Sequence, residues 1–588
     1  MRTRIGNILI WVIIAATVAA CAKVGPDGPV VPPDPVDPVG PAEEKPQPGE
    51  YLLPVIETTD IHGYIIKAED ATIHYRMAYL ADKVNDIRGH GGGNDKSRLL
   101  LLDGGDLYQG AAISNLQDGK PLFTAIDKMG YDAVALGNHE FDWGFENTSD
   151  PDATVPDYEW DGRLCVNEVP LICANIYRYG SRVSDTRDYV IVEKTAKSSK
   201  GAAVTVKIGV VGFAVDYSGS IMSSKFKDIG YTIQEDYSAA NRIAAELEAE
   251  GKCDATVLLI HGAADRAAEN LGRGSAFDLV LGGHSHVTFA ARTAWGMPYL
   301  QGGRYCEHYA YADLKFTVDQ TGEVSFAGVE NISTRSVDSD RDRREYTGQN
   351  ADNLEEEILE VSDRAIEVSA PQLNEVIGYI DVGATTYYIN GSGERAAVMS
   401  NWMCDILRRI GNADVAFVNA GGIRTYIALN GKKTRNITVA NVYEMFPFGN
   451  NTYVYEITYQ ELLQLFTYSL TNGGKILFSR MTGIDCHYSN YTVKSLVKDG
   501  TVIYRNNRWT GDWASRTLRL VASEYIATSQ YVDYYTNLGN PLIEWNSTSR
   551  LLYYTLVDNE NAVRVLKEEA AASGGLLSID TAPHFILD

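Results

Sequence analysis

The chain is poor in positive charge, in cysteine and in histidine, and each shortage narrows the possible functions. Its 588 residues include 52 Lys and Arg against 77 Asp and Glu, a formal net charge of −25. That balance argues against a nucleic-acid-binding scaffold, which needs a basic surface stripe. The six cysteines after Cys21 have spacings that match no small disulfide framework, so we expect most of them to be free and buried.

The first 50 residues predict an export signal followed by a tether. Two arginines precede the apolar stretch Ile8–Ala20, which is too short to span a bilayer as a mature helix and fits the core of a secretion signal. The stretch ends in Val-Ala-Ala-Cys21, which resembles the lipobox of bacterial lipoproteins; an ordinary cleavable signal is the alternative. We therefore predict a signal peptide over residues 1–20, lipidation of Cys21, and a proline-rich, semi-rigid tether over residues 21–50.

Five short apolar runs in the first half of the chain end in residues that can bind metal. Each run is rich in Leu, Val and Ile, which indicates a buried strand with a polar group just past its carboxyl end. Open α/β sheets carry their chemistry at that edge. Five of the ten histidines lie there. In chain order the polar residues are Asp60, His62, Asp106, Asn138, His139, Asp142, His261, His284 and His286.

The types and spacing of these side chains favour a metal site. Residues i and i+2 of an extended segment point to the same side, so we expect each closely spaced pair to present its donors to one region. The pairs are Asp60 with His62, and His284 with His286. Carboxylate, imidazole and amide oxygen suit Zn, Mn, Co or Fe better than a thiolate-only or oxygen-only set. Each motif alone is weak. Gly-Asn-His-Glu could also open a protease helix, but Trp143 stands where that helix needs its second histidine.

Together the motifs resemble the calcineurin-like metallophosphoesterase domain of the family that contains 5'-nucleotidases, UDP-sugar hydrolases and 2',3'-cyclic phosphodiesterases. They stand here as Asp60-Ile-His62, Gly105-Asp106-Leu-Tyr-Gln-Gly110, Gly137-Asn-His-Glu-Phe-Asp142, His261 after an apolar strand, and Gly282-Gly-His-Ser-His286. The resemblance implies two metal ions bridged by Asp106. The first would also be held by Asp60, His62 and His286, and the second by Asn138, His261 and His284.

The resemblance also implies a catalytic dyad of His139 and Asp142. The histidine would stabilise charge on the transferring phosphoryl group or assist the leaving oxygen, and the aspartate would orient its ring. A helix cap is the alternative role for Asp142.

Alternating strand and helix patterns predict an α/β catalytic domain over residues 51–337. The resemblance implies that this domain is a two-sheet sandwich flanked by helices. A polar stretch and a charged helical pattern predict a linker with a helix over residues 338–372. Residues 373–588 would form an α+β substrate-binding domain, the 5'-nucleotidase C-terminal domain.

Two motifs of the C-terminal part resemble the family's substrate-binding motifs. Asn419-Ala-Gly-Gly-Ile-Arg424 places two glycines beside an arginine, so backbone can approach a ligand while the guanidinium reaches phosphate. In Pro-Phe448-Gly-Asn450, the phenylalanine would stack on a base, and alignment of a later aromatic segment places Tyr525 on the other face. A turn with a surface arginine, and two core aromatics, are the alternatives.

Two departures from the family pattern concern the sugar and the phosphate. The family's Gly-Gly-Asp-Gly stretch is replaced by Thr528-Ser-Gln-Tyr531, so the carboxylate that would contact the sugar is missing. Arg395 matches only loosely the arginine that precedes the first helix of the family's C-terminal domain.

The resemblance implies metal-dependent hydrolysis of nucleotide phosphate esters by an exported, lipid-anchored enzyme that scavenges nucleotides. Its partners would be the ester substrate and, through Cys21, a bacterial membrane at the periplasmic face or cell surface, with no protein partner implied. A 2',3'-cyclic nucleotide phosphodiesterase or nucleotide-sugar hydrolase is the alternative, and a surface-binding lipoprotein without turnover is a remote one.

Overall fold

The computed structural model describes most of the chain after the N-terminal segment. The described residues are 46–69, 72–89, 95–141, 158–160, 163–165, 168–183, 186–215, 230–337, 353–384, 398–418, 422–423, 425–447, 450, 452–471, 481–523, 551–555 and 558–588. The predicted signal peptide and most of the tether lie outside them. So do seven predicted functional residues, which are Cys21, Asp142, Arg395, Asn419, Arg424, Phe448 and Tyr525.

Strand β1 (Gly49–Thr58) is central to the N-terminal part because it is paired along both edges. On one edge β18 runs antiparallel to it, and on the other β4 runs parallel to its carboxyl half. In spatial order the strands of this first sheet are β19 (Val324–Ser336), β18 (His308–Val318), β1, β4 (Leu100–Asp103), β5 (Ala133–Ala135) and β8 (Leu171–Ile172).

A second sheet continues from β1, and the strand ladder joins it to the first at one residue pair, Leu52 with Lys197. Its strands, in spatial order, are β11 (Tyr189–Lys197), β12 (Ala203–Ala214), β14 (Ala255–His261), β15 (Leu279–Gly282), β17 (Pro298–Gly302) and β16 (Thr288–Arg292). Neighbours from β12 to β17 are parallel. The loops that follow these strands therefore leave from one edge of the sheet.

The two sheets pack face to face through apolar side chains. Tyr51, Leu53 and Val55 alternate along β1, as the period of two in a strand requires, and share one buried cluster with Val257 and Leu259 of β14. The predicted two-sheet sandwich is confirmed, although a single hydrogen-bonded ladder runs through both sheets.

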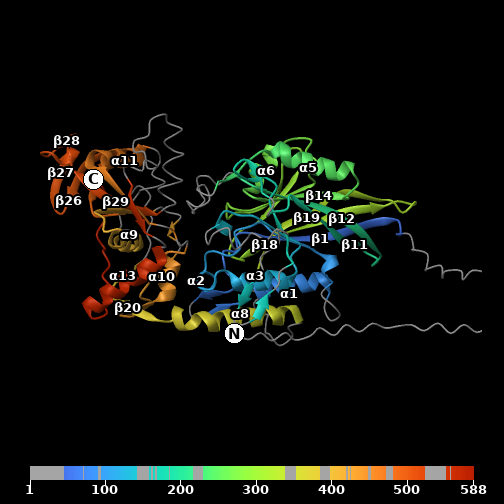
Figure 1. Cartoon of the computed structure of the whole chain (residues 1–588), viewed down its shortest axis with the longest axis horizontal. Coiled ribbons are helices and arrows are strands. Elements are labelled where there is room, and N and C mark those ends of the chain that lie inside the picture. The colour runs from blue at the N-terminus through green and yellow to red at the C-terminus, as the bar shows by residue number, and fades with distance from the viewer. Residues whose placement is uncertain are drawn as a thin grey trace, which may run out of the picture. The chain divides into compact units, whose positions relative to one another are not determined.

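Helices cover the outer faces. Apolar side chains of α1 (Arg76–Arg88), α3 (Lys120–Met129) and α8 (Asn353–Leu373) pack in one buried cluster, and those of α5 (Tyr237–Ala249) and α6 (Ala264–Leu271) in another. Figure 1 shows these two helical layers on opposite sides of the stacked strands. Helix α8 contains the charged helical pattern that the sequence predicted for the linker.

In the described residues of the C-terminal part, there are two larger sheets and four α-helices. The first sheet has the order β24 (Met481–Thr482), β21 (Val415–Phe417), β29 (Thr517–Ser523), β23 (Thr452–Thr458) and β30 (Leu551–Thr555). The second has the order β28 (Arg508–Trp509), β27 (Thr501–Arg505), β26 (Thr492–Lys498), β25 (Asp485–Ser489) and β31 (Phe585–Leu587). The helices are α9 (Val398–Ile410), α10 (Val439–Met445), α11 (Tyr459–Thr471) and α13 (Asp558–Ser573).

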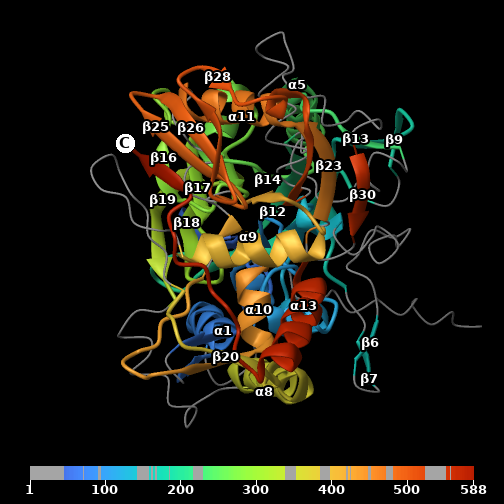
Figure 2. The same ribbon diagram turned by 90° about the vertical axis from the view of Figure 1, so that its left-hand side faces the viewer.

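These elements make two apolar clusters on opposite faces of the first C-terminal sheet. Residues of α9, α10 and α13 pack with Val454 and Val521, whereas α11 packs with Phe417 and the second sheet. Figure 2 shows α10 beside α13, and α11 near β25 and β26. This α+β arrangement agrees with the predicted fold class, while the exact domain boundaries stay a prediction.

Short strand pairs complete the described structure. They are β2 (Lys67–Glu69) with β3 (Thr72–His74), β6 (Tyr158–Trp160) with β7 (Arg163–Cys165), β9 (Ile176–Arg178) with β10 (Ser181–Arg182) and β13 (Tyr231–Ile233), and β20 (Val376–Ile380) with β22 (Arg435–Thr438).

Two further expectations concern cysteines and membranes. Of the five cysteines whose side chains the structure describes, four are buried, as expected. Within the described part of the chain, no helix is both long and apolar enough to cross a membrane.

Candidate metal centre

The loops that follow β1 and β4 lie side by side and are tied by their backbones. The amides of Asp60, His62 and Gly63 donate hydrogen bonds to the carbonyls of Gly105, Asp106 and Leu107, each at 2.9 Å. The neighbouring parallel strands β1 and β4 end at the same edge, so their loops continue this pairing. Asp60 and His62 are thereby fixed beside Asp106.

The backbone of five of the seven predicted ligands is not extended, which corrects the reasoning from residues i and i+2. Asp60, His62, Asp106, His284 and His286 all have positive φ, between 50° and 68°. Non-glycine residues adopt this left-handed region rarely, and such outliers gather at functional sites where the surrounding structure enforces them. Tight turns, rather than strand alternation, aim these side chains.

Six of the predicted ligands gather in two groups. Within each group, the donor atoms lie within 4.8 Å of one another. One group contains Asp60, His62 and His286, and the other contains Asp106, His261 and His284. His284 and His286 therefore belong to different groups.

Short distances link the groups through Asp106. Its Oδ2 lies 3.2 Å from His261 Nε2 in its own group and 3.8 Å from His62 Nε2 in the other. Asn138 lies at the second group, with its Oδ1 3.2 Å from His261 Nε2 and 2.9 Å from His284 Nδ1. All seven predicted ligands thus converge, with Asp106 between the two groups.

Backbone carbonyls fix the tautomers of two of the histidines. His62 Nδ1 lies 2.8 Å from the carbonyl oxygen of Gln109, and His261 Nδ1 lies 2.7 Å from that of Gly104. A carbonyl only accepts, so each Nδ1 carries the proton and donates it. Each Nε2 is then the ring nitrogen left to bind a metal ion, the arrangement typical of metal-binding histidines.

The charges at the site also suit a cation. Burial lowers the pKa of His62 to about 3 and that of His284 to about 4, so both are neutral imidazoles at pH 7. Burial alone would lower the pKa of His261, but the Asp106 carboxylate raises it to about 10. In the absence of a metal ion, a proton on His261 balances Asp106. A divalent cation provides that positive charge in its place, because metal binding displaces ligand protons.

Glu140 is a site residue that the sequence analysis missed. Its carboxylate accepts hydrogen bonds from the amides of Gly137, Asp106 and Leu107 at 2.6, 3.0 and 2.8 Å, so it ties the loop after β5 to the loop after β4. Burial raises the pKa of Glu140 to about 7. Its place next to His139 in Gly-Asn-His-Glu was the available signal. At Gly137 a Cβ would collide with Asp106 Oδ1, which explains the glycine that opens this motif.

His139 lies at the edge of the two groups. Its amide donates a hydrogen bond of 2.8 Å to Asp106 Oδ1, and the centroid of its ring is 5.2 Å from that of His62. The imidazole is therefore adjacent to the predicted metal ligands. Its predicted partner Asp142 lies outside the described residues.

Two family models match the chain at these parts. The model described as calcineurin-like phosphoesterase matches residues 53–288, and the model described as 5'-nucleotidase, C-terminal domain, matches residues 376–502. The chain belongs to the 5'-nucleotidase family of metallophosphoesterases. It is accordingly a phosphoric ester hydrolase, and membership of this family implies divalent metal ions at the two groups.

Relatives in this family have moderate identity to the chain. The 5'-nucleotidase of Vibrio cholerae serotype O1 is 24% identical over 455 residues, which span 70% of this chain and 74% of that protein. The trifunctional nucleotide phosphoesterase protein YfkN of Bacillus subtilis is 25% identical over 474 residues, 75% of this chain but only 29% of YfkN. The chain thus spans less than a third of that larger relative.

A solved structure has the same fold. The 5'-nucleotidase precursor of Thermus thermophilus aligns with a TM-score of 0.59 and 19% identity, covering 91% of this chain and 99% of that one. The fold of the family therefore extends over both parts of the chain.

Of the predicted substrate-binding residues, Asn450 is the one that the structure describes, and it lies beside the start of helix α13. Asn450 is buried, and its carbonyl accepts a hydrogen bond of 2.8 Å from the amide of Asp558, the first residue of α13. Asn559 Nδ2 donates a hydrogen bond of 3.2 Å to the carbonyl of Phe446. The start of α13 thus holds both flanks of the segment that contains Phe448.

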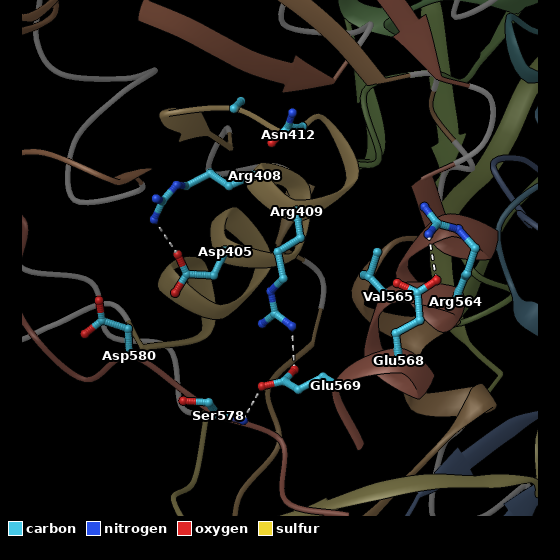
Figure 3. Close-up of a pocket in the computed structure, with 11 residues that line it drawn as sticks. Asp405, Arg408, Arg409, Asn412, Arg564, Val565, Glu568, Glu569, Ser578 and Asp580 are labelled. Carbon is cyan, nitrogen blue, oxygen red and sulfur yellow. Dashed lines mark hydrogen bonds and ion pairs between the residues drawn. The ribbon is translucent and has the colours of Figure 1, made fainter. Parts of the chain in front are cut away.

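A separate cavity of about 930 Å³ lies in the C-terminal part and contains no predicted site residue. Figure 3 shows its arginines paired with neighbouring carboxylates. The pairs are Arg408 with Asp405 at 3.1 Å, Arg409 with Glu569 at 2.6 Å and Arg564 with Glu568 at 3.0 Å. Since each of these guanidiniums is already matched by a carboxylate, we assign the cavity no role in phosphate binding.

Proposed function

We propose that the protein hydrolyses nucleotide phosphate esters at a centre of two divalent cations. The observation that carries this proposal is the convergence of seven predicted ligands in two groups that meet at Asp106. The family of the chain and the names of its relatives support nucleotides as the substrate class.

The side chains at the site match the two cations that the family implies. Asp60, His62, Asp106 and His286 would hold the first cation, and Asp106, Asn138, His261 and His284 the second. Four imidazoles, two carboxylates and an amide oxygen are a donor set suited to Zn, Mn, Co or Fe. When bound, such a cation pair supplies Lewis acidity, which polarises the phosphoryl oxygens and makes a water molecule acidic.

The protein's own residues then position and protonate the ester. His139, held by its amide against Asp106, would donate a hydrogen bond to the phosphoryl group or a proton to the leaving oxygen. We propose that Asp142 orients the His139 ring. Because Glu140 fixes the loops that carry Asp106 and His139, it holds these two residues in a constant relative position.

Substrate recognition would come from the C-terminal part. We propose that Phe448 and Tyr525 stack on the two faces of the base, that Arg424 and Arg395 contact the phosphate side, and that Asn419 and Asn450 complete the pocket. Stacking on an aromatic ring contributes about 1–3 kcal/mol per base. A small ester such as 4-nitrophenyl phosphate lacks the base and would depend on the metal centre, His139 and Arg424.

The N-terminal sequence supports an exported enzyme anchored by lipid at Cys21. The proline-rich tether would hold the catalytic part away from the bacterial membrane, where nucleotides outside the cytoplasm are accessible. Hydrolysis there would release phosphate and nucleoside for uptake.

A substrate panel tests this proposal and its alternatives. Phosphate release is measured from AMP, UDP-glucose, 2',3'-cyclic AMP and bis(4-nitrophenyl) phosphate, with added Mn²⁺ or Zn²⁺ and with chelator. The proposal predicts metal-dependent turnover that is fastest for AMP. Faster turnover of the cyclic nucleotide or the nucleotide sugar would favour the alternative reactions. Binding of all four substrates without turnover would favour a binding protein that has no catalytic activity.

The variant Phe448→Ala tests the base pocket separately. We expect kcat/KM for AMP to fall by a factor that corresponds to roughly 1–3 kcal/mol of lost stacking free energy. The value for 4-nitrophenyl phosphate should stay near that of the wild type. Equal losses on both substrates would identify Phe448 as a core residue.

A further inference from the structure

The carbonyl of Pro447, immediately before Phe448, is bound by two side chains from the loop after β4. Gln109 Nε2 donates a hydrogen bond of 2.8 Å to it, and Asn115 Nδ2 donates one of 3.1 Å. Asn115 is the last residue of helix α2 (Ala112–Asn115). Its side chain also accepts a hydrogen bond from the amide of Gly110 and donates one to the carbonyl of Gly110. Pro447 is therefore anchored to the same loop that carries Asp106.

Gln109 contacts the metal centre as well. Its carbonyl oxygen accepts the hydrogen bond from His62 Nδ1 at 2.8 Å, and its side chain is 1% exposed. One residue thus bonds a predicted metal ligand through its backbone and the C-terminal part through its amide group. The bond to Pro447 is the hydrogen bond of this side-chain amide within the described part of the chain.

The segment bound by Gln109 is also fixed from within the C-terminal part. Asn559 holds the carbonyl of Phe446, and the amide of Asp558 holds that of Asn450. These bonds hold Phe446 and Asn450 to the start of α13 but do not relate them to the metal ligands. Gln109 and Asn115 provide that relation, and Gln109 alone of the two touches a ligand.

We propose that Gln109 is a positioning residue that sets the distance between the base-binding segment at Phe448 and the metal centre. This inference rests on the proposed function, because only a substrate that spans both regions senses their separation. A nucleotide needs its base on the aromatic ring and its phosphate at the metal ligands at the same time, and misplacement of reacting groups by about an ångström is costly. A small phosphate ester has no base to place on the aromatic ring.

The test replaces Gln109 by methionine, which has a similar volume and no hydrogen-bond donor. The backbone carbonyl that binds His62 remains, so metal content should not change. Loss of one net hydrogen bond corresponds to about a fivefold effect. We expect KM for AMP to rise and kcat/KM to fall by about fivefold, with both constants for 4-nitrophenyl phosphate unchanged. The rise in melting temperature that AMP causes should also be smaller than in the wild type.

Gln117→Met is the matched control. Gln117 is a buried glutamine just after α2, and its Nε2 bonds Ile113, Ala365 and Ser369, which tie α2 to α8 rather than to Pro447. Its replacement should lower thermal stability without changing the ratio of kcat/KM between AMP and 4-nitrophenyl phosphate.

The outcomes separate this inference from the function on which it rests. A wild-type protein that does not hydrolyse AMP would overturn the proposed function. A wild-type protein that hydrolyses AMP, together with a Gln109→Met variant of unchanged selectivity, would overturn only the role of Gln109. Equal losses on both substrates, or the same change of selectivity in Gln117→Met, would likewise reject it and indicate a general structural effect.

Discussion

Replacing Asp106 by asparagine should remove negative charge from the metal centre while keeping the shape of the centre. The carboxylate is 2% exposed, its Oδ2 lies between ligand nitrogens of both groups at 3.2 and 3.8 Å, and its Oδ1 accepts the amide of His139. Asparagine keeps the volume and one acceptor oxygen but removes one negative charge. At an effective dielectric constant of about 20, unit charges about 4 Å apart interact by about 4 kcal/mol, or about a thousandfold in the affinity of a cation.

We therefore expect Asp106→Asn to lose bound metal and to release phosphate from AMP at least about a thousandfold more slowly, with its fold retained. Metal content is measured by mass spectrometry, turnover by phosphate release, and folding by circular dichroism. A variant that keeps its metal and the wild-type rate would refute the bridging role.

Asp103→Asn is the control for this experiment. Asp103 is fully buried on β4, and burial raises its pKa to about 8, so its carboxyl is mostly protonated at pH 7. The same substitution there removes little charge, and we expect metal content and rate to stay within a few-fold of the wild type. Equal damage from both substitutions would assign the effect to packing of β4.

Three further predictions concern the dyad, the anchor and the C-terminal strand. His139→Ala should lower kcat by about 10²–10⁴-fold, the usual contribution of general acid–base catalysis, and keep its metal; an unchanged kcat would remove His139 from the reaction. Cys21→Ser should move the full-length protein from the membrane pellet to the soluble fraction, whereas continued pelleting would place the anchor elsewhere. Burial alone would lower the pKa of His584, but its hydrogen bonds to two carboxylates raise it. Its stabilising effect should be complete below about pH 6.5 and decline as the pH rises through the raised pKa. His584→Asn should accordingly lower the melting temperature more at pH 6 than at pH 9, and equal losses would show that its charge is unimportant.

The metal ligands could be predicted because each follows a short apolar run, and the carboxyl ends of parallel strands meet at one edge. The local backbone could not be predicted in the same way. Asp60 and His62 have left-handed backbone conformations that distant segments stabilise, through bonds such as that between the amide of His62 and the carbonyl of Asp106. No periodicity in the sequence encodes such a turn.

Residues that act through other residues were the least visible in the sequence. The motif Gly-Asp-x-x-x-Gly does not specify the residue at position 109, and the partner of Gln109, Pro447, lies 338 residues later in the chain. Only the folded arrangement shows that it joins the two parts of the site. Glu140 stands inside Gly-Asn-His-Glu, but its role depends on three amides from two loops that the sequence does not show to be adjacent.

The number of cations needed for turnover tests the central claim most directly. Chelated, metal-free protein is titrated with Mn²⁺ while phosphate release from AMP is followed. The account predicts no turnover at the start and a rate that rises until two equivalents per chain are bound. Full turnover of the metal-free protein, or saturation at a single equivalent, would contradict it.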